Sequence, residues 1–283
     1  MVIQSPPGWG WDRIRLAWHQ VGSAPAEEYL EADAAPVIRR IGIADLRDAL
    51  ANGLADFEAN RTDVIFLCII YPAIGLVLGR IASGYGLLPL LFPLASGFAL
   101  VGPFAAVGLN EMSRRRERNG ETRWVDAFGV LRAPSVGSIM LLGAMLVALF
   151  LLWLVVAQII YLMTLGPMPP VSVQAFCTDV FTTAPGRTMI VAGMGVGFLF
   201  ALLVLAISAV SFPLLLDRPV GIGPAITTSV RAVAANPGIM ALWGLIVAAG
   251  LVIGSIPLFL GLVVVLPVLG HATWHLYRRV VPR

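Results

Sequence analysis

The 27 residues 136–162, VGSIMLLGAMLVALFLLWLVVAQIIYL, contain no charged side chain and decide the fold class. A helix that crosses a bilayer needs roughly 20 mostly apolar residues, because its backbone must satisfy its own hydrogen bonds within lipid. Gly166, Pro167 and Pro169 follow the stretch and predict the end of the helix, since proline lacks the amide hydrogen that a helix interior uses. The stretch therefore predicts a transmembrane helix.

The whole composition extends this prediction. The 283 residues include 58% hydrophobic and 12% charged residues, with a mean hydropathy of +0.88, whereas about a quarter of the residues in a soluble domain are charged. We predict an all-α polytopic membrane protein with one domain over residues 38–281. Its six transmembrane helices cover about residues 64–82, 87–109, 136–162, 189–216, 238–254 and 258–277. Residues 1–37 lack the continuous apolar core of a signal peptide and are expected to form a flexible cytoplasmic tail with an interfacial helix.

The arginines predict the orientation of these helices. Seventeen of the 19 arginines fall in the two tails and in the second and fourth loops, whereas Arg80 and Arg187 fall on the opposite side. Positively charged residues concentrate on the cytoplasmic side of membrane proteins. We therefore expect both termini in the cytoplasm.

A short amphipathic segment precedes each outward-going span. Its apolar positions are Ile43, Leu46, Leu50, Leu54 and Phe57 in the first copy, Val125, Phe128 and Leu131 in the second, and Ile222, Ile226, Val230 and Val233 in the third. Spacings of three and four predict helices with one apolar stripe, and in the first copy Asp56 is expected on the opposite, polar face. An ungapped alignment of the first and third copies also pairs Asn60 with Asn236. We predict three repeats, each an interfacial helix followed by a transmembrane hairpin.

Each returning span also carries a proline in its cytoplasmic half: Pro103, Pro213 and Pro267. A proline frees a backbone carbonyl and bends its helix, which membrane proteins tolerate where a neighbouring helix or water satisfies the freed group. The three kinked helices are therefore expected to face one another.

The spans contain no Asp, Glu, Lys or Arg at mid-depth, so we expect no catalytic residue and no metal there. His271 and His275 lie one helical turn apart and are the weak candidates for binding a haem or a metal, but no third ligand is evident. Trp274 and Tyr277 beside them are typical of an interfacial belt, so the favoured interpretation is a polar cytoplasmic helix end and no cofactor.

Few other polar or small residues stand out within the spans. Gln158 is expected to make an interhelical hydrogen bond, and Asn110 lies at the end of the second span. Close helix packing is expected at Gly193, Gly195, Gly197, Gly244 and Gly250.

The second loop concentrates Arg114, Arg115, Arg116 and Arg118 beside the membrane. This cluster could dock anionic lipid headgroups or the acidic surface of a partner. The favoured interpretation is charge that serves only to orient the chain in the membrane.

Four segments together resemble the bacterial family named domain of unknown function 2189 (DUF2189): GFALVGPFAAVGLNEMSRRRER, VRAVAANPG, MALWGLIVAAG and VLGHATWHLYRRVV. The resemblance extends over about residues 38–281, and the chain departs from the family pattern at Asn110, where an aromatic residue is expected. It implies an integral protein of the bacterial inner (plasma) membrane and supplies no activity.

Three functions fit these features. The first is a non-enzymatic scaffold, assembly or accessory protein for another membrane complex, with the lipid bilayer as its surroundings and no nucleic acid as a partner. The second is a small-solute permease or channel lined by the proline-kinked spans. The third is a redox subunit that binds haem or a metal through His271 and His275.

Overall fold

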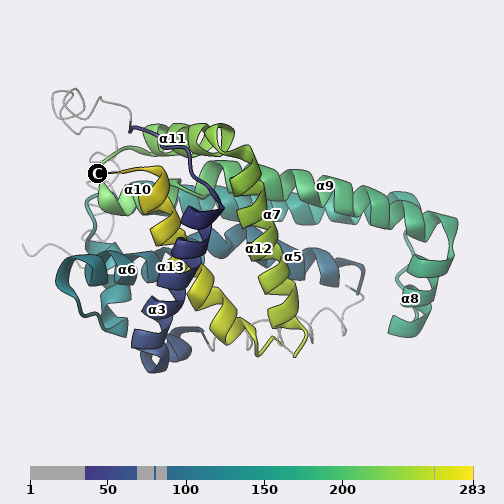
Figure 1. Ribbon diagram of the computed structural model, residues 1–283. Coiled ribbons are helices and arrows are strands. Elements are labelled where there is room, and N and C mark those ends of the chain that lie inside the picture. Colours follow the sequence, from purple (N-terminus) through teal and green to yellow (C-terminus); the bar gives the residue numbers. More distant parts are fainter. Residues whose placement is uncertain (1–35, 69–79, 81–87, 258, 283) are drawn as a thin grey trace, which may run out of the picture.

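The computed structural model describes residues 36–68, 80, 88–257 and 259–282, and over these residues the chain forms helices and no β-strand (Figure 1). The elements are α3 (Ile43–Cys68), η1 (Leu88–Leu90), α5 (Leu91–Ala105), α6 (Val107–Asn119), η2 (Trp124–Arg132), α7 (Val136–Thr164), α8 (Val173–Thr182), α9 (Ala184–Ser208), α10 (Ser211–Asp217), α11 (Ile222–Ala235), α12 (Pro237–Ser255) and α13 (Leu262–Val280), where η marks a 3₁₀ helix. The predicted all-α fold class is confirmed over the described part of the chain.

Within these ranges, four helical segments are long and apolar enough to cross a membrane. They are Leu88–Asn119, Val136–Thr164, Ala184–Asp217 and Pro237–Ser255, and they overlap the second to fifth predicted spans. The first predicted span, 64–82, lies largely outside the described residues. The sixth, 258–277, corresponds to α13, which is not among the four because its second half carries two histidines and two arginines.

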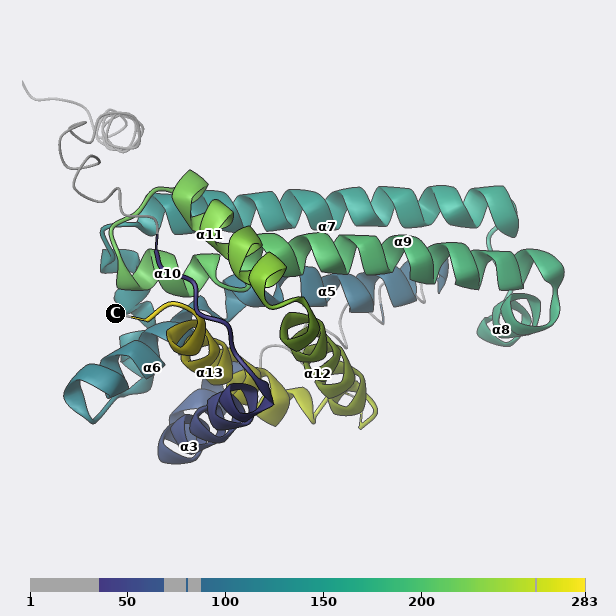
Figure 2. The same ribbon diagram turned by 45° about the horizontal axis from the view of Figure 1, so that its top comes forward.

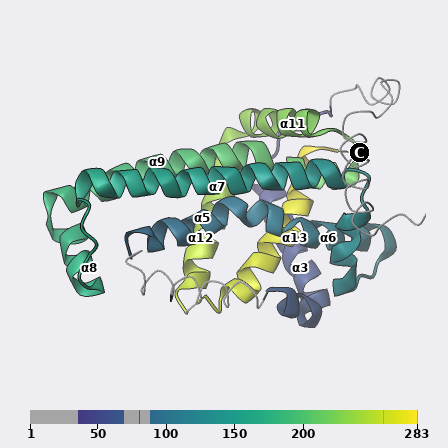
Figure 3. The same ribbon diagram turned by 180° about the vertical axis from the view of Figure 1, so that it is seen from behind.

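The long helices α7 and α9 lie side by side, and α5 runs alongside them (Figures 1, 2 and 3). With 29 residues, α7 measures roughly 44 Å, which exceeds the hydrocarbon thickness of a bilayer. Figure 1 places α8 at one end of this pair, and α6, α10 and the C-terminus at the other. A local N-cap begins α9, because the hydroxyl of Thr183 accepts from the amide of Gly186 and Pro185 occupies the first turn of the helix.

Trp153 connects the three helices of this group. Its indole N–H donates to the carbonyl of Pro93 on α5 at 3.0 Å, and its ring lies 5.6 Å from that of Phe200 on α9. Only 3% of Trp153 is exposed, so this hydrogen bond satisfies a donor that would otherwise be buried without a partner. Gly197 packs here as expected, because a Cβ atom at this position would lie 3.2 Å from the indole.

A second group, α3, α12 and α13, runs across the first (Figures 1 and 3). In α3, Gly53 approaches α13 so closely that an added Cβ would lie 2.6 Å from the backbone nitrogen of Ala272. Gly250 of α12 packs against Val265 of α13, at 3.1 Å from an added Cβ. Glycine therefore allows these helix backbones to come together, as the sequence predicted for Gly250.

The returning helix α9 is interrupted just before Pro213. Regular helix ends at Ser208 and resumes with α10 at Ser211. The amide of Val210 donates to the hydroxyl of Ser229 at 3.1 Å, and the hydroxyl of Ser211 donates to the carbonyl of Ala225 at 3.0 Å. Both partners lie on α11, so this neighbouring helix satisfies backbone and side-chain groups at the break.

The other two prolines lie inside helices that meet this break. Pro103 lies in α5, which ends two residues later, and Pro267 lies in α13. The rings of Phe104 and Phe212 are 6.1 Å apart, and an added Cβ at Gly270 of α13 would lie 2.5 Å from Leu109. The three proline-bearing helices thus pack together at one end of the molecule.

Candidate functional site

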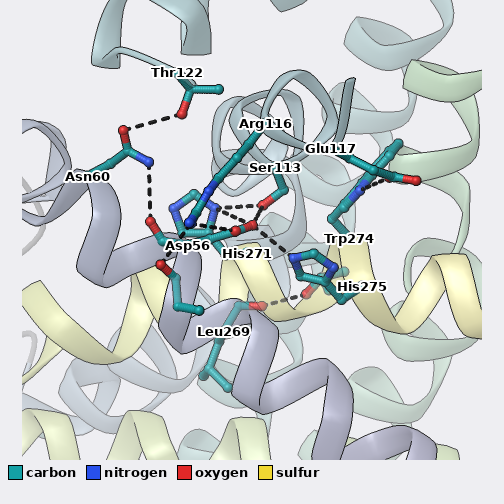
Figure 4. Close-up of polar contacts among 12 residues, drawn as sticks. Asp56, Asn60, Ser113, Arg116, Glu117, Thr122, Leu269, His271, Trp274 and His275 are labelled. Atoms are coloured by element: carbon teal, nitrogen blue, oxygen red, sulfur yellow. Dashed lines mark hydrogen bonds and ion pairs between the residues drawn. The ribbon is translucent and has the colours of Figure 1, made fainter. Parts of the chain in front are cut away.

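Side chains from three helices converge where α3, α6 and α13 meet (Figure 4). We call the set the Asp56 cluster: Asp56 from α3, Ser113 and Arg116 from α6, and His271 and His275 from α13. Residues separated by 219 positions in the sequence, Asp56 and His275, are in direct contact. No pattern within one segment would predict this meeting.

Each helix presents its members through local spacing. His271 and His275 are four residues apart, and Ser113 and Arg116 are three apart, so each pair shares a helical face. On α3, Asn60 leaves the helical conformation (φ −122°, ψ 17°) and donates from its side chain to the carbonyl of Asp56 at 3.2 Å. The hydroxyl of Thr122 donates to Asn60 at 3.2 Å, which connects this kink to the loop after α6.

The carboxylate of Asp56 is the centre of the cluster and is only 6% exposed. Its Oδ2 accepts from the hydroxyl of Ser113 at 2.6 Å and lies 2.8 Å from Nε2 of His275. Its Oδ1 accepts from Arg116 at 2.9 Å, and the same guanidinium nitrogen donates to the carbonyl of Ala55 at 2.7 Å. A buried carboxylate requires such partners, because its desolvation would otherwise destabilise the fold.

The hydrogen bonds assign the proton positions of the histidines. Ser113 gives its single proton to Asp56, so Nδ1 of His271, 2.8 Å from the same hydroxyl, must act as the donor in that contact. Its Nε2 is then a buried acceptor without a hydrogen bond in the described part of the chain. His275 donates from Nε2 to Asp56. The chain His271, Ser113, Asp56 is therefore a directed series of hydrogen bonds.

Two opposing effects act on the pKa of Asp56. Burial alone raises the pKa of this carboxyl. Hydrogen bonds from His275 and Ser113, together with the charge of the neighbouring histidines, lower the pKa by more than burial raises it. The net pKa lies below the ordinary value of 3.8. Asp56 is therefore ionised at neutral pH and stabilised in that form.

The expected basic cluster of the second loop is also paired within the chain. Arg114 and Arg115 both bind the fully buried carboxylate of Glu111 at 2.7 Å, and Arg115 also contacts Asp126 at 2.6 Å. Arg116 binds Asp56, and Arg118 lies 3.7 Å from Asp217. Arg115, Arg116 and Arg118 thus connect α6 to other segments of the chain, whereas Arg114 pairs within α6.

The aromatic residues of α13 are placed differently from the prediction. The indole of Trp274 donates to Glu117 at 2.9 Å, and the hydroxyl of Tyr277 donates to Asp217 at 2.9 Å. Both side chains are fully buried. The interpretation of Trp274 and Tyr277 as an interfacial belt is therefore wrong, because their polar atoms bind carboxylates of α6 and α10 rather than facing a membrane surface.

The sequence also misplaced Asp56, which was expected on the polar outer face of the first amphipathic segment. It is buried because α13 covers that face of α3, and no periodicity within α3 contains this information. Glu111 and Ser113 were missed as well. Arginines three and four residues after Glu111 were the available signal for its pairing.

Other predicted polar positions do not join the cluster. Gln158 makes no hydrogen bond with another described residue, so its expected interhelical bond is not observed there. Asn110 is buried, and its side-chain oxygen has no partner among the described residues. Around Gly193 and Gly195 the described part of the chain places no atom within 4 Å of an added Cβ.

The geometry suits a structural network better than a cofactor site. No group of three His, Cys, Asp or Glu side chains able to bind a metal occurs in the described ranges. His271 and His275 each use one ring nitrogen in the network, and His271 is completely buried. The described Cys177 is free and exposed on α8. A shallow hollow lies elsewhere, at the start of α9 around Arg187 and Val191.

Comparison with protein families identifies one segment. Residues 91–217 match the family DUF2189, described as a predicted integral membrane protein, which confirms the expected resemblance over this part of the chain. The match extends from α5 to α10 and contains Ser113 and Arg116, whereas Asp56 and the two histidines lie outside it. No curated protein and no solved structure matches the chain.

Proposed function

Because residues 91–217 match a family of predicted integral membrane proteins, we propose that the chain is a non-enzymatic membrane protein that helps to assemble or stabilise another membrane complex. One contrast supports this proposal best. The ionisable side chains of the Asp56 cluster are used in contacts within the chain, whereas only 11–28% of the apolar windows of the four candidate spans is buried. The uncovered span surface is available to lipid and to helices of another membrane protein.

Our topology for this protein has six spans in a bacterial inner membrane, with both termini cytoplasmic. The arginine distribution supports this orientation, since 17 arginines belong to one side. The arrangement of α6, α10 and the C-terminus at one end of the α7 and α9 pair, with α8 at the other, agrees with it (Figure 1).

Three repeats of an interfacial helix and a transmembrane hairpin complete the proposed architecture. The support comes from two junctions that the sequence alignment pairs, at Asn60 and Asn236. Asn236 also leaves the helical conformation (φ −131°, ψ 48°), and its side chain donates to the carbonyl of Ala232, four residues earlier, at 3.1 Å. Asn60 makes the same bond to Asp56. Equivalent residues thus end the first and third amphipathic helices in the same way.

The other two functions are less well supported. A permease lined by the proline-bearing helices would need a polar path between them, but Phe104 and Phe212 pack where two of these helices meet. A redox subunit would need free imidazole nitrogens, and the contacts of His271 and His275 with Ser113 and Asp56 leave one nitrogen on each ring, that of His271 being enclosed.

Purification from native membranes in mild detergent tests the assembly role. We expect a membrane protein to co-purify with the native chain and to be lost from a Gly193→Leu/Gly195→Leu double variant. Neither added side chain meets a described atom close to its Cβ, so the variant should fold. Gly238→Leu, at an exposed position on α12 with the same open surroundings, is the matched control and should retain the partner. A native chain that purifies alone would contradict the assembly role. A partner that all variants retain equally would contradict the use of the α9 surface at Gly193 and Gly195 in that role.

A further inference from the structure

The 3₁₀ helix η2 (Trp124–Arg132) has its polar side toward the protein and its apolar side outward. Asp126 points to Arg115, with 2.6 Å between oxygen and nitrogen. Val125 and Phe128 are each 51% exposed, and Leu131 is 65% exposed. A water-exposed helix normally has the opposite arrangement, whereas a helix at a membrane surface presents its apolar side to lipid.

The position of η2 along α6 agrees with a membrane surface. The segment connects two candidate spans, Leu88–Asn119 and Val136–Thr164. Ala127 of η2 packs on Gly108 of α6, where an added Cβ would lie 3.2 Å away. At this point of Leu88–Asn119, apolar residues give way to the charged residues that begin at Glu111. In a bilayer crossed by these two candidate spans, this level corresponds to the boundary between hydrocarbon and headgroups.

Glycine allows η2 to cover the buried charge of α6. An added Cβ at Gly129 would lie 2.9 Å from a carboxylate oxygen of Glu111 and closer still to the guanidinium of Arg115, so a larger residue would displace this ion pair. Glu111 is fully buried beneath it. The segment thus helps to cover the Glu111 carboxylate, whereas the side chain of Arg115 stays 34% exposed, and it turns its own apolar side chains outward.

The charges that flank η2 differ from those of the preceding loop. Arg114, Arg115, Arg116 and Arg118 are all paired with carboxylates. Arg123 and Arg132, at the two ends of η2, are exposed and form no salt bridge with a described residue. Two unneutralised guanidinium groups on either side of an apolar edge complement the phosphates of anionic lipid above its acyl chains.

We propose that η2 lies in the headgroup region of the bilayer and binds anionic phospholipid, with Val125, Phe128 and Leu131 at the acyl boundary and Arg123 and Arg132 on the phosphates. The binding goes beyond the assembly role and does not depend on it. It also reassigns the expected lipid contact. The arginines of the second loop, Arg114, Arg115, Arg116 and Arg118, use their charges within the chain, so the lipid contact is assigned to Arg123 and Arg132 instead.

Depth measurements on the full-length protein in nanodiscs test where η2 lies. In a Cys68→Ser/Cys177→Ser background, an environment-sensitive fluorophore is attached through Phe128→Cys and, as the matched control, through Asn119→Cys at the exposed end of α6. We expect lipid-borne quenchers to act on position 128 and aqueous iodide to act on position 119. Position 128 quenched by iodide like position 119 would overturn the proposal, and protection from both quenchers would do so too, by indicating a protein on this surface.

The charge preference is tested by titrating phosphatidylglycerol into detergent-purified protein and following the melting temperature. The quantity compared is the lipid concentration that gives half of the rise in melting temperature. Each arginine near an anionic surface contributes to the free energy of lipid binding. Losing two of them in Arg123→Gln/Arg132→Gln should therefore raise this lipid concentration roughly 10- to 30-fold. The control, Arg47→Gln/Arg187→Gln, removes the same charge away from η2 and should stay within about 2-fold of the native protein. Equal responses of the two double variants, or no response of the native protein, would overturn the proposal. Neither outcome bears on co-purification of a partner, so the two proposals fail independently.

Discussion

Replacing Asp56 by asparagine should destabilise the fold far more than the same change at Asp48 of the same helix. The Asp56 carboxylate contacts Ser113, His275 and Arg116 at 2.6–2.9 Å and is buried. Asparagine keeps one acceptor oxygen, and Arg116 keeps the carbonyl of Ala55, so the loss is about one charged hydrogen bond and its ion pair. Such bonds contribute about 1.5–3 kcal/mol, and breaking a fully buried pair costs about 3–5 kcal/mol. Because Arg116 is partly exposed and can regain water, we expect a loss of about 2–3 kcal/mol.

Thermal unfolding of the purified full-length protein in mild detergent, followed by tryptophan fluorescence, measures this loss. For a chain of this size about 2–3 kcal/mol corresponds to a fall in melting temperature of roughly 5–10 °C. Asp48→Asn is the matched control, because Asp48 is 53% exposed and its ion pair with Arg279 should contribute less than about 1 kcal/mol. Melting temperatures that fall equally in the two variants would refute the view that the Asp56 cluster ties α3 to α6 and α13.

Three further changes have expected outcomes. Since the pKa of Asp56 is lower in the folded protein than its ordinary value of 3.8, its stabilising contribution is complete above that value and is lost as the pH falls through the folded pKa. The melting temperature of the native protein should therefore fall more steeply below about pH 4 than that of Asp56→Asn, and parallel curves would contradict this. Gly53→Ala should cost about 1–3 kcal/mol in chemical denaturation because its Cβ meets the backbone of Ala272, whereas Gly223→Ala on α11, with open surroundings, should be neutral or mildly stabilising. Asn236→Ala removes the acceptor of the buried amide of Ile41, 2.8 Å away, and should cost about 1–3 kcal/mol; unchanged unfolding would show that water replaces the amide group.

The long apolar spans were the most predictable part of the fold. Residues 136–162 and 238–254 were expected to be helical, and α7 (Val136–Thr164) and α12 (Pro237–Ser255) cover them. Length, hydropathy and helix breakers act locally, so a single stretch contains the information that determines such a helix. The ends were less predictable where a tertiary contact changes the helix, as at Ser208, where α11 supplies hydrogen-bond partners to the break.

The Asp56 cluster was not predictable in the same way. The spacing of His271 and His275 on one helical face was readable, but their partners are Ser113 on α6 and Asp56 on α3. The sequence predicted that the arginines of the second loop form a charge cluster. Their carboxylate partners, which neutralise four of them within the chain, are visible only in the tertiary structure.

The sequence by itself determined that this protein is helical and resides in a membrane, because the cost of exposing apolar residues to water, or backbone polar groups to lipid, acts on each segment separately. The tertiary structure decided which polar residues are buried, which charges are paired and which apolar edge remains open. Those outcomes depend on side chains far apart in the sequence, since burial makes a charge acceptable only when another segment brings its partner within hydrogen-bonding distance. Asp56, a carboxylate expected on the polar face of its helix, is buried at the centre of the cluster that joins α3, α6 and α13 for that reason.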